Sequence, residues 1–452
     1  MTKNWANIPF SPGKWPFFYG WMILIWGVVG FVMSIPGQTI GVSVFTDSLI
    51  DVLRINRDQL SLAYMFGTIG SSFMLPWAGK LYDRIGVRPV VIVAGLGLGL
   101  VLVFFSQVDD ALAPFIRKEW EIGVILLMVF AFLLLRFFGQ GVLTIASRNM
   151  MVQWFDKRRG FAIGFANVAI SLSFSSSPVL LYVMIENFKW SGAWLVMAGI
   201  VGIIFPLFAF VFFRNRPEDS GLIPDGAVLK AKKDKRNLFP FVKDFEQMEA
   251  MKQYAFWIFA LMLAMQGLFI TGFTFNVLSI FEEAGLTEAD AITIFQPAAV
   301  IAVFVTLISS NISDYVPLKY LLYVKGIGSC VAIVGIVLLG QTSYAYYLIV
   351  TGMGVFTGLY SVINTLVWPR YFGRKHLGAI SGQAMMMVVF GSALGPLLFS
   401  GSLSQFGTYA VACWVCFGIY LFLTLGSIWA NNPQIGLARG LKTPSGELKP
   451  SN

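Results

Sequence analysis

Arg136 lies near the centre of the apolar run 122–150, where an ionised side chain is costly. An arginine in the middle of a membrane span costs roughly 2.5 to 3.5 kcal/mol on insertion scales, so such residues usually face the protein interior and have a function. The sequence offers no aspartate or glutamate at a comparable depth. Because a guanidinium binds a carboxylate through two parallel hydrogen bonds, Arg136 predicts an anionic ligand. The alternative is a structural arginine held by helix carbonyls and by the amide of Gln140, one turn later.

A second span offers polar groups of its own. Tyr360 and Asn364 are four residues apart in the apolar run 345–369 and therefore share a helical face. They can offer a hydroxyl and an amide to a ligand, or they can form hydrogen bonds between helices, as polar residues in membrane bundles commonly do. The other mid-span polar residues individually favour packing but together predict a polar cavity; they are Gln38, Tyr64, Gln266, Asn276, Gln296 and Gln383. The residues to which we assign substrate binding are Arg136, Gln140, Tyr360, Asn364, Gln38, Tyr64 and Gln266.

Residue sets for enzymatic chemistry are missing from the sequence. There is no Ser/His/Asp set, no metal-ligand cluster and no phosphate-binding glycine loop, and the single histidine, His376, stands in a basic loop. Cys413 and Cys416 lie in an apolar run without the βαβ context of a redox motif, so we interpret them as packing residues. We therefore expect no enzyme, no metal and no cofactor.

A polar motif between apolar runs occurs twice, which indicates a duplicated chain. The segment 79–89 reads GKLYDRIGVRP, and a degraded copy, SNISDYVPLK, occupies 310–319. Gly141 and the Trp-Phe pair thirteen residues later are echoed by Gly358 and a Tyr-Phe pair at the same spacing. A membrane protein built of two similar halves is typical of secondary transporters, whose substrate path lies at the interface between the halves.

The composition places the chain in a lipid bilayer. Mean hydropathy is +0.74 and 12% of residues are charged, compared with roughly a quarter in soluble proteins. The apolar runs predict an all-α integral membrane protein with twelve transmembrane helices in two pseudo-symmetric six-helix halves. The predicted spans lie near 18–46, 58–78, 88–105, 122–150, 160–185, 192–213, 254–280, 290–310, 320–340, 345–369, 379–402 and 406–430.

The distribution of charge predicts the domain boundaries and the orientation. Residues 1–213 form the N-terminal half, 214–252 a basic linker, and 253–452 the C-terminal half with a short tail. Lysine and arginine gather in alternate loops, at 80–88, 157–159 and 374–375. The positive-inside rule places these loops and both termini in the cytoplasm of a cell membrane. The sequence pI of 9.4 follows from these loops, so we expect no nucleic-acid partner.

The pattern Gly79-x-Leu81-x-Asp83-Arg84-x-Gly86-x-Arg88 resembles the loop signature of the major facilitator superfamily. The resemblance implies two six-helix halves that alternate access, with this loop holding one conformation closed. Asp83 is then a gate residue, and Arg148 at the cytoplasmic end of span four is its predicted ionic partner. In the second copy Tyr315 stands where an arginine would follow the aspartate. The predicted gating residues are Gly79, Asp83, Arg84, Gly86, Arg88, Arg148 and Asp314.

Within that superfamily the chain resembles the branch of oxalate/formate antiporters and monocarboxylate transporters. The resemblance rests on the ordered segments WPFFYGW at 15–21, R-x-x-GQG at 136–141, WF at 154–155 with RRG at 158–160, and RPEDSGLIPDG at 216–226. It implies that the face of span ten with Tyr360 and Asn364 lines the site. The chain departs from the branch in span eight, where 291–309 holds no cation. The usual anion-binding charges of the branch therefore do not carry over.

The function that these patterns favour is secondary transport of a small organic anion, a carboxylate, at a site walled by spans one, four, seven and ten. The predicted partners are the anionic substrate, the lipid bilayer and a coupling ion, either a proton or a counter-anion, and we expect a monomer. One alternative is a proton-driven exporter of amphipathic compounds, which would need a carboxylate inside the membrane. Another is a membrane solute sensor that does not transport.

Overall fold

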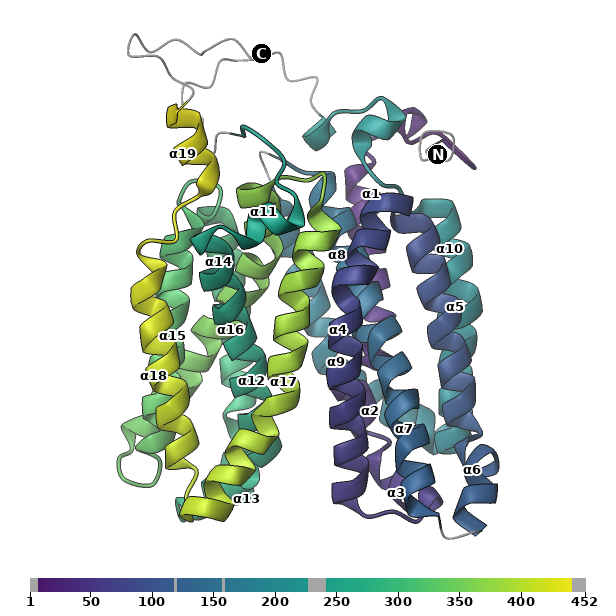
Figure 1. Cartoon of the computed structure of the whole chain (residues 1–452), viewed down its shortest axis with the longest axis vertical. Helices are drawn as coiled ribbons and strands as arrows, with labels where there is room; N and C mark the ends of the chain where they lie inside the picture. Colours follow the sequence, from purple (N-terminus) through teal and green to yellow (C-terminus); the bar gives the residue numbers. More distant parts are fainter. Residues whose placement is uncertain (1–6, 118–119, 157–158, 227–240, 441–452) are drawn as a thin grey trace. The chain divides into compact units, whose positions relative to one another are not determined.

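The computed structural model describes residues 7–117, 120–156, 159–226 and 241–440. In these ranges every regular element is a helix and no strand occurs (Figure 1). The predicted all-α architecture is confirmed. Residues 227–240 of the predicted basic linker, and residues 157–158 of one basic loop, lie outside the described part of the chain.

The helices have the following bounds. Up to residue 226 the principal elements are α1 (Gly20–Val32), η3 (Ile35–Gly37), α2 (Thr39–Ser43), α3 (Thr46–Leu53), α4 (Arg57–Ile85), α5 (Val87–Ser106), α6 (Val108–Arg117), α7 (Glu121–Arg136), the π-helix η4 (Phe137–Leu143), α8 (Thr144–Gln153), α9 (Arg159–Gly199), the π-helix η5 (Ile200–Ile204) and α10 (Phe205–Phe212). From residue 241 they are α11 (Gln247–Met251), α12 (Tyr254–Glu283), α13 (Glu288–Thr293), α14 (Phe295–Ile312), α15 (Leu318–Val337), α16 (Tyr344–Phe372), α17 (Leu377–Phe406), α18 (Ala410–Ser427) and α19 (Pro433–Gly440).

Nine stretches of the described chain are long and apolar enough to cross a membrane. The longest, Arg159–Phe212, contains Lys189 with a φ of 61°, so it holds two helices that correspond to the predicted spans 160–185 and 192–213. α1 is a shorter apolar helix of 13 residues, and α4 has 29 residues with polar side chains along it. With these two helices included, the described chain accounts for the twelve predicted spans.

The first predicted span, 18–46, is not one continuous helix. α1 ends at Val32, and Pro36 and Gly37 form a short 3-10 turn before α2 begins at Thr39. Proline cannot supply a backbone N–H to the helix, and Gly37 comes so close to another helix that an added Cβ would lie 2.5 Å from the Leu135 carbonyl oxygen. This break leaves the backbone at Gly37 beside the end of α7.

Packing divides the described residues into two compact units. The first contains most of the chain up to Gly226 together with Ser381–Ala393 from α17, and the second contains the later residues together with 159–165 from the start of α9. Each exchanged segment is held by specific contacts within its unit. In the first unit, Asn149 Nδ2 donates a hydrogen bond of 2.9 Å to Ser381 Oγ.

Each unit has an aromatic core. In the first, Phe45 stacks on Trp194 with ring centroids 4.0 Å apart, and Phe105 lies 5.4 Å from Trp194. In the second, Phe269 makes edge contacts with Phe356 at 6.0 Å and with Tyr420 at 6.2 Å. These rings join helices that are distant in sequence, and such pairs add to the stabilisation from buried area alone.

Candidate functional site

Arg136, the last residue of α7, is buried with 2% of its surface exposed. Its Nη1 donates to the Gly37 carbonyl oxygen and to the Thr39 hydroxyl, both at 3.3 Å. Its guanidinium carbon lies 5.1 Å from the centroid of the Tyr64 ring, and the Tyr64 hydroxyl donates to Thr39 Oγ1 at 2.9 Å. The break after α1 thus supplies two of the three contacts of Arg136. All of them are neutral, so the positive charge has no counter-charge among the described residues.

One edge of the Arg136 guanidinium is unused. The Nε atom is buried and has no hydrogen-bond partner, and no hydrogen bond joins Nη2 to a described residue. Nε and Nη2 form the planar fork with which arginine binds a carboxylate through two hydrogen bonds. Part of the structural alternative is realised, because one helix-end carbonyl does hold Nη1. The predicted contact between Arg136 and the Gln140 amide does not form, because Gln140 Oε1 has no hydrogen-bond partner.

The π-helix η4 begins immediately after Arg136 and contains Gly139 and Gln140. Single π-turns within α-helices occur frequently at functional sites. Here the wide turn brings Gly139 against Gly37, so that a Cβ on Gly139 would lie 2.6 Å from the Gly37 Cα. Gln38 lies beside this contact and donates through Nε2 to Ser34 Oγ at 3.1 Å. Arg136, Tyr64, Gln38 and Gln140 are therefore all associated with one small region of the first unit.

The second unit carries the other predicted ligands. Gln266 on α12 and Asn364 on α16 are each 5% exposed. Asn364 Oδ1 accepts a hydrogen bond of 3.5 Å from Trp368 Nε1 on the same helix, so this bond does not join two helices. Gln266 Oε1 and Asn364 Nδ2 are buried without partners. Tyr360 is half-buried one turn before Asn364, on the predicted shared face.

One of the remaining polar residues serves packing. Asn276 Oδ1 accepts hydrogen bonds from the hydroxyls of Ser400 at 3.3 Å and Tyr409 at 3.4 Å, which lie in other segments of the second unit. Gln296 is exposed and Gln383 is half-buried. Asn276 therefore fits the structural interpretation better than the ligand interpretation.

The predicted gate motif of the first unit spans the end of α4 and the start of α5. Gly79 is buried, Asp83 is half-buried and Arg84 is exposed. Gly86 separates the two helices with a φ of 88°, in the region that favours glycine. Asn215 Oδ1 accepts from the next backbone N–H, that of Val87, at 2.7 Å.

The two other arginines of the predicted gate contact neighbouring segments. Arg88 is buried, and its Nε donates to the Phe213 carbonyl at 3.2 Å and its Nη2 to the Ile8 carbonyl at 2.8 Å. Arg88 therefore ties the N-terminal segment to the end of α10. The guanidinium carbon of Arg148 lies 5.2 Å from the centroid of the Phe31 ring on α1.

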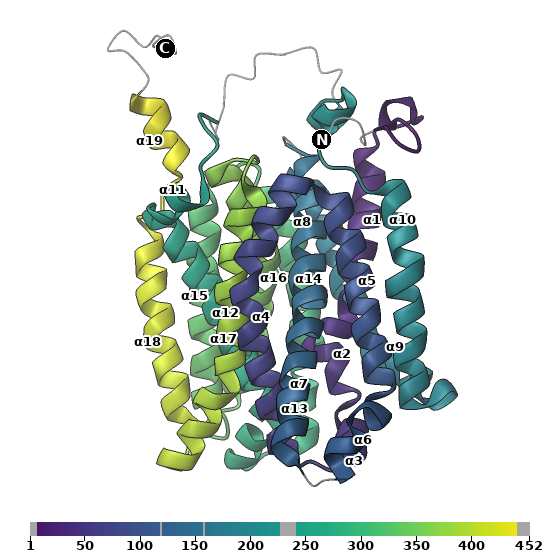
Figure 2. The same ribbon diagram turned by 45° about the vertical axis from the view of Figure 1, so that its right-hand side comes forward.

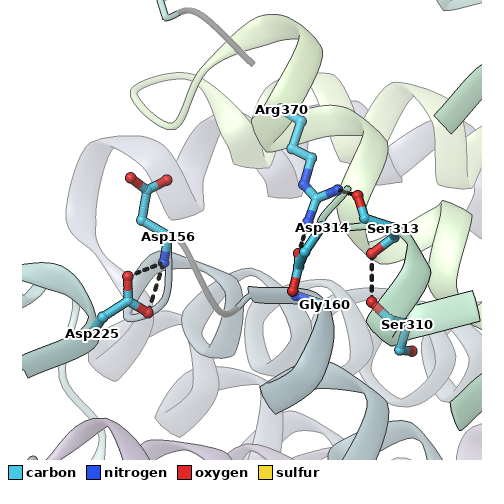
Figure 3. A network of polar contacts seen from close by, with 7 residues as sticks. All are labelled: Asp156, Gly160, Asp225, Ser310, Ser313, Asp314 and Arg370. Atoms are coloured by element: carbon cyan, nitrogen blue, oxygen red, sulfur yellow. Dashed lines mark hydrogen bonds and ion pairs between the residues drawn. The ribbon is translucent and has the colours of Figure 1, made fainter. Parts of the chain in front are cut away.

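Asp314 forms the equivalent polar centre in the second unit (Figure 3). Its carboxylate forms an ion pair with Arg370 of α16 and accepts from the Gly160 backbone N–H at 3.1 Å. Arg370 also donates to the Ser313 carbonyl. Burial raises the pKa of the Asp314 carboxyl, while Arg370 and the backbone N–H groups of Gly160 and Phe161 act in the opposite direction. Asp314 is thus linked both to α16 and to the start of α9.

Sequence reasoning missed two cations of the second unit. Arg370 stands 56 residues after Asp314, so the motif around the aspartate contains no sign of it. Lys325 lies inside α15 and is 0% exposed. The sequence contained a signal for Lys325, because a lysine five residues into the predicted span 320–340 is as unusual as an arginine in span four.

Comparisons with known proteins agree with this architecture. Residues 23–396 match the family model described as Major Facilitator Superfamily. The hexuronate transporter of Bacillus subtilis (strain 168) is 22% identical over 403 residues, which cover 86% of this chain and 90% of that protein. Human monocarboxylate transporter 11 is 25% identical over 410 residues, which cover 88% of this chain and 77% of that protein.

Solved structures show the same fold. A proton:xylose symporter of the superfamily, bound to 6-bromo-6-deoxy-D-glucose, has a TM-score of 0.61 at 15% identity and covers 90% of this chain and 94% of its own. A bacterial homologue of the iron transporter ferroportin, in its outward-facing state with soaked iron, has a TM-score of 0.63 at 15% identity, with coverage of 90% and 98%. The predicted family and fold are confirmed, and this multi-pass membrane protein belongs to the Major Facilitator Superfamily.

Proposed function

We propose that the protein is a secondary transporter that carries a small organic carboxylate across the membrane by alternating access. The observation that carries this proposal is the buried guanidinium of Arg136, whose contacts are all neutral. A buried charge without a counter-charge is unfavourable unless a partner compensates for its lost hydration. A substrate carboxylate on the Nε/Nη2 edge supplies that partner, and it supplies it only while the substrate is bound.

Unpaired side-chain amide atoms favour a substrate that carries hydroxyl groups as well as a carboxylate. Gln140 Oε1 in the first unit and Gln266 Oε1 in the second are acceptors without donors. A buried acceptor without a donor costs about 1–3 kcal/mol, which a hydroxyl of the ligand would recover. Asn364 Nδ2 offers a donor in return. We therefore assign substrate binding to Arg136, Gln140, Tyr64 and Gln38 in the first unit and to Gln266, Tyr360 and Asn364 in the second.

The names of two similar proteins support a carboxylate as the substrate. One is named for hexuronates, which are hydroxylated carboxylates, and another for monocarboxylates. The unpaired acceptors Gln140 Oε1 and Gln266 Oε1 favour carboxylates that also carry hydroxyl groups.

Asp83 and Asp314 serve as gate residues in this proposal, because each stands in a copy of the repeated motif between two helices.

The test measures uptake of radiolabelled D-glucuronate and L-lactate by the full chain in proteoliposomes. The parent should take up at least one of these carboxylates, and D-glucuronate should be preferred. Arg136→Gln should abolish uptake and binding. Arg136→Lys keeps the charge but loses the planar fork, and it should weaken binding by about 1.5–3 kcal/mol, as for one hydrogen bond to a charged group.

Two controls make the result specific to recognition of the carboxylate. The neutral D-glucuronamide should bind the parent weakly, and its binding, measured directly by the shift of the unfolding midpoint, should change little in Arg136→Gln. Arg57→Gln alters an exposed arginine whose side chain is 66% exposed and pairs with Asp47, and it should transport like the parent. If Arg136→Gln folds normally and binds D-glucuronate as tightly as the parent, Arg136 is structural and the carboxylate proposal loses its basis.

A further inference from the structure

Lys325 is an ionisable residue inside the second unit for which the proposed function has no role. It stands seven residues after the first residue of α15, Leu318 (325 − 318 = 7), which is about 10 Å along the helix. None of its surface is exposed. α15 packs against α16 and α18, as Figures 1 and 2 both show. The side chain therefore lies within the membrane-spanning part of the unit.

The surroundings of the Lys325 amine are neutral. Nζ donates to the Met262 carbonyl oxygen of α12 at 3.4 Å, and it lies 5.5 Å from the centroid of the Tyr420 ring on α18 and 5.9 Å from that of the Phe356 ring on α16. No carboxylate forms an ion pair with it in the described ranges.

Few titratable groups face this amine. The nearest is the Tyr420 phenol, and Cys416 on α18 and Cys330 on α15 lie close enough to that phenol to interact with it electrostatically. α12 and α16 present the Met262 carbonyl and the Phe356 ring, neither of which titrates. A proton gained or lost at Lys325 therefore changes the net charge of this region without a neighbouring acid to cancel the change.

The contacts of Lys325 connect it to two of the proposed substrate ligands. Met262 is four residues before Gln266 on α12, and Phe356 is four residues before Tyr360 on α16. The amine thus touches each helix about one turn from a proposed ligand. An ammonium donates more strongly to a carbonyl and is attracted to ring faces, whereas a neutral amine lacks the ring attraction. Protonation at Nζ therefore strengthens its contacts with the Met262 carbonyl and the Phe356 ring, each about one turn from Gln266 or Tyr360.

We propose that Lys325 is the proton-binding site that couples proton movement to transport of the anion, an inference that rests on the proposed function. The amine is neutral when no anion is bound, because an unpaired buried ammonium is unfavourable. When the anion binds beside Gln266 and Tyr360 of the same unit, its negative charge favours the ammonium through Coulomb attraction. One N–H bond forms with a proton taken from water on one side of the membrane and breaks when that proton is released on the other, so proton and anion move together.

The experiment uses the full chain in proteoliposomes with a pH-sensitive dye in the lumen and radiolabelled D-glucuronate outside. In the parent, an acidic outer buffer should drive accumulation of D-glucuronate and acidify the lumen. Lys325→Met keeps the length of the side chain and removes the titratable amine. We expect gradient-driven accumulation by this variant to fall about tenfold, within the range of coupling between two sites, and exchange without a gradient to fall less.

The matched control is Lys319→Met, six residues earlier on the same helix. The Lys319 amine is exposed and bonds Asn431 Oδ1 at 2.7 Å, so its loss should leave accumulation and lumen acidification as in the parent. Lys325→Gln is a second neutral variant in case Lys325→Met does not fold. If either neutral variant folds and still accumulates D-glucuronate and acidifies the lumen like the parent, the assignment of the proton site is wrong while the transport function stands.

A second measurement does not depend on the identity of the substrate. The midpoint of thermal unfolding in detergent is recorded from about pH 5 to 9 for the parent and for each variant, because a group that titrates differently in the folded and unfolded states makes stability depend on pH. The difference between parent and Lys325→Met should change across this range, and the difference between parent and Lys319→Met should stay constant. A constant difference for Lys325→Met would overturn the proposal. If the parent transports neither D-glucuronate nor L-lactate, the transport proposal fails, and this titration still decides whether Lys325 exchanges a proton.

Discussion

Arg370 of α16 forms an ion pair with Asp314, which precedes it by 56 residues and belongs to the second copy of the repeated motif. The side chains are 6% and 14% exposed, so water screens the pair weakly. The second copy has Tyr315 where the first has Arg84, and a different helix supplies the cation instead. The aspartate of the degraded copy therefore has a cationic partner that lies outside its own motif.

A double-mutant cycle on this pair should show strong coupling. Asp314→Asn or Arg370→Gln alone leaves one buried partner uncompensated, and each should lower the free energy of unfolding by about 3 kcal/mol. The double variant should lose less than the sum of the two. Thermal or denaturant unfolding in detergent measures all four proteins. The exposed Arg57–Asp47 pair is the control, where Arg57→Gln should change stability by less than about 1 kcal/mol. Additive losses at Asp314 and Arg370 would show that the pair is not coupled.

Asp83→Asn should impair transport and leave binding of the substrate largely intact. Asp83 stands in the motif at the end of α4, several turns along that helix from Tyr64. Removal of its charge therefore acts on conformational change and not on the ligand. D-glucuronate uptake and equilibrium binding are measured on the same preparation, with Asp58→Asn, an exposed acid in the first turn of α4, as the control. A loss of binding equal to the loss of uptake would argue against the gate role.

Cysteines at positions 360 and 364 should react with a small anionic thiol reagent, and D-glucuronate should protect them. The basis is the shared face of Tyr360 and Asn364 and the unpaired Nδ2 of Asn364. Labelling is measured in a background in which the three native cysteines are replaced by alanine. A cysteine at Ile363, a residue with no exposed surface on the same helix, should stay unreactive. Cysteines at 360 and 364 that are unreactive in every condition would assign both residues to packing.

Gly37→Ala should lower both stability and affinity for the anion. The new Cβ would lie 2.5 Å from the Leu135 carbonyl oxygen and 2.7 Å from the Gly139 Cα, which are backbone atoms that cannot rotate away. Overpacking of this kind costs about 1–3 kcal/mol, and it displaces the carbonyl that holds Arg136 Nη1. Gly199→Ala is the control, because a Cβ there meets no atom within 4 Å. Parent-like unfolding and binding in Gly37→Ala would show that this contact between helices is loose.

The membrane class, the number of spans, the duplication and the family could all be predicted from the amino-acid sequence. These properties depend on hydropathy along the chain and on short motifs, and both are local. The isolation of Arg136 from acidic residues was also visible, because the sequence of each span shows which charges the span contains. The hydroxyl and amide of Tyr360 and Asn364 could be placed on one face by the period of an α-helix alone.

Which residues contact each other could not be predicted in this way and is known from the folded chain. The break at Pro36 and Gly37 places a carbonyl at Arg136, and Arg370 reaches Asp314 from another helix. Lys325 is distinguished by the neutral carbonyl and rings around its amine, which come from three other helices. Such contacts depend on how each helix is rotated about its axis and on which helices are neighbours. Helix packing sets both, and the spacing of residues along one span contains no record of either.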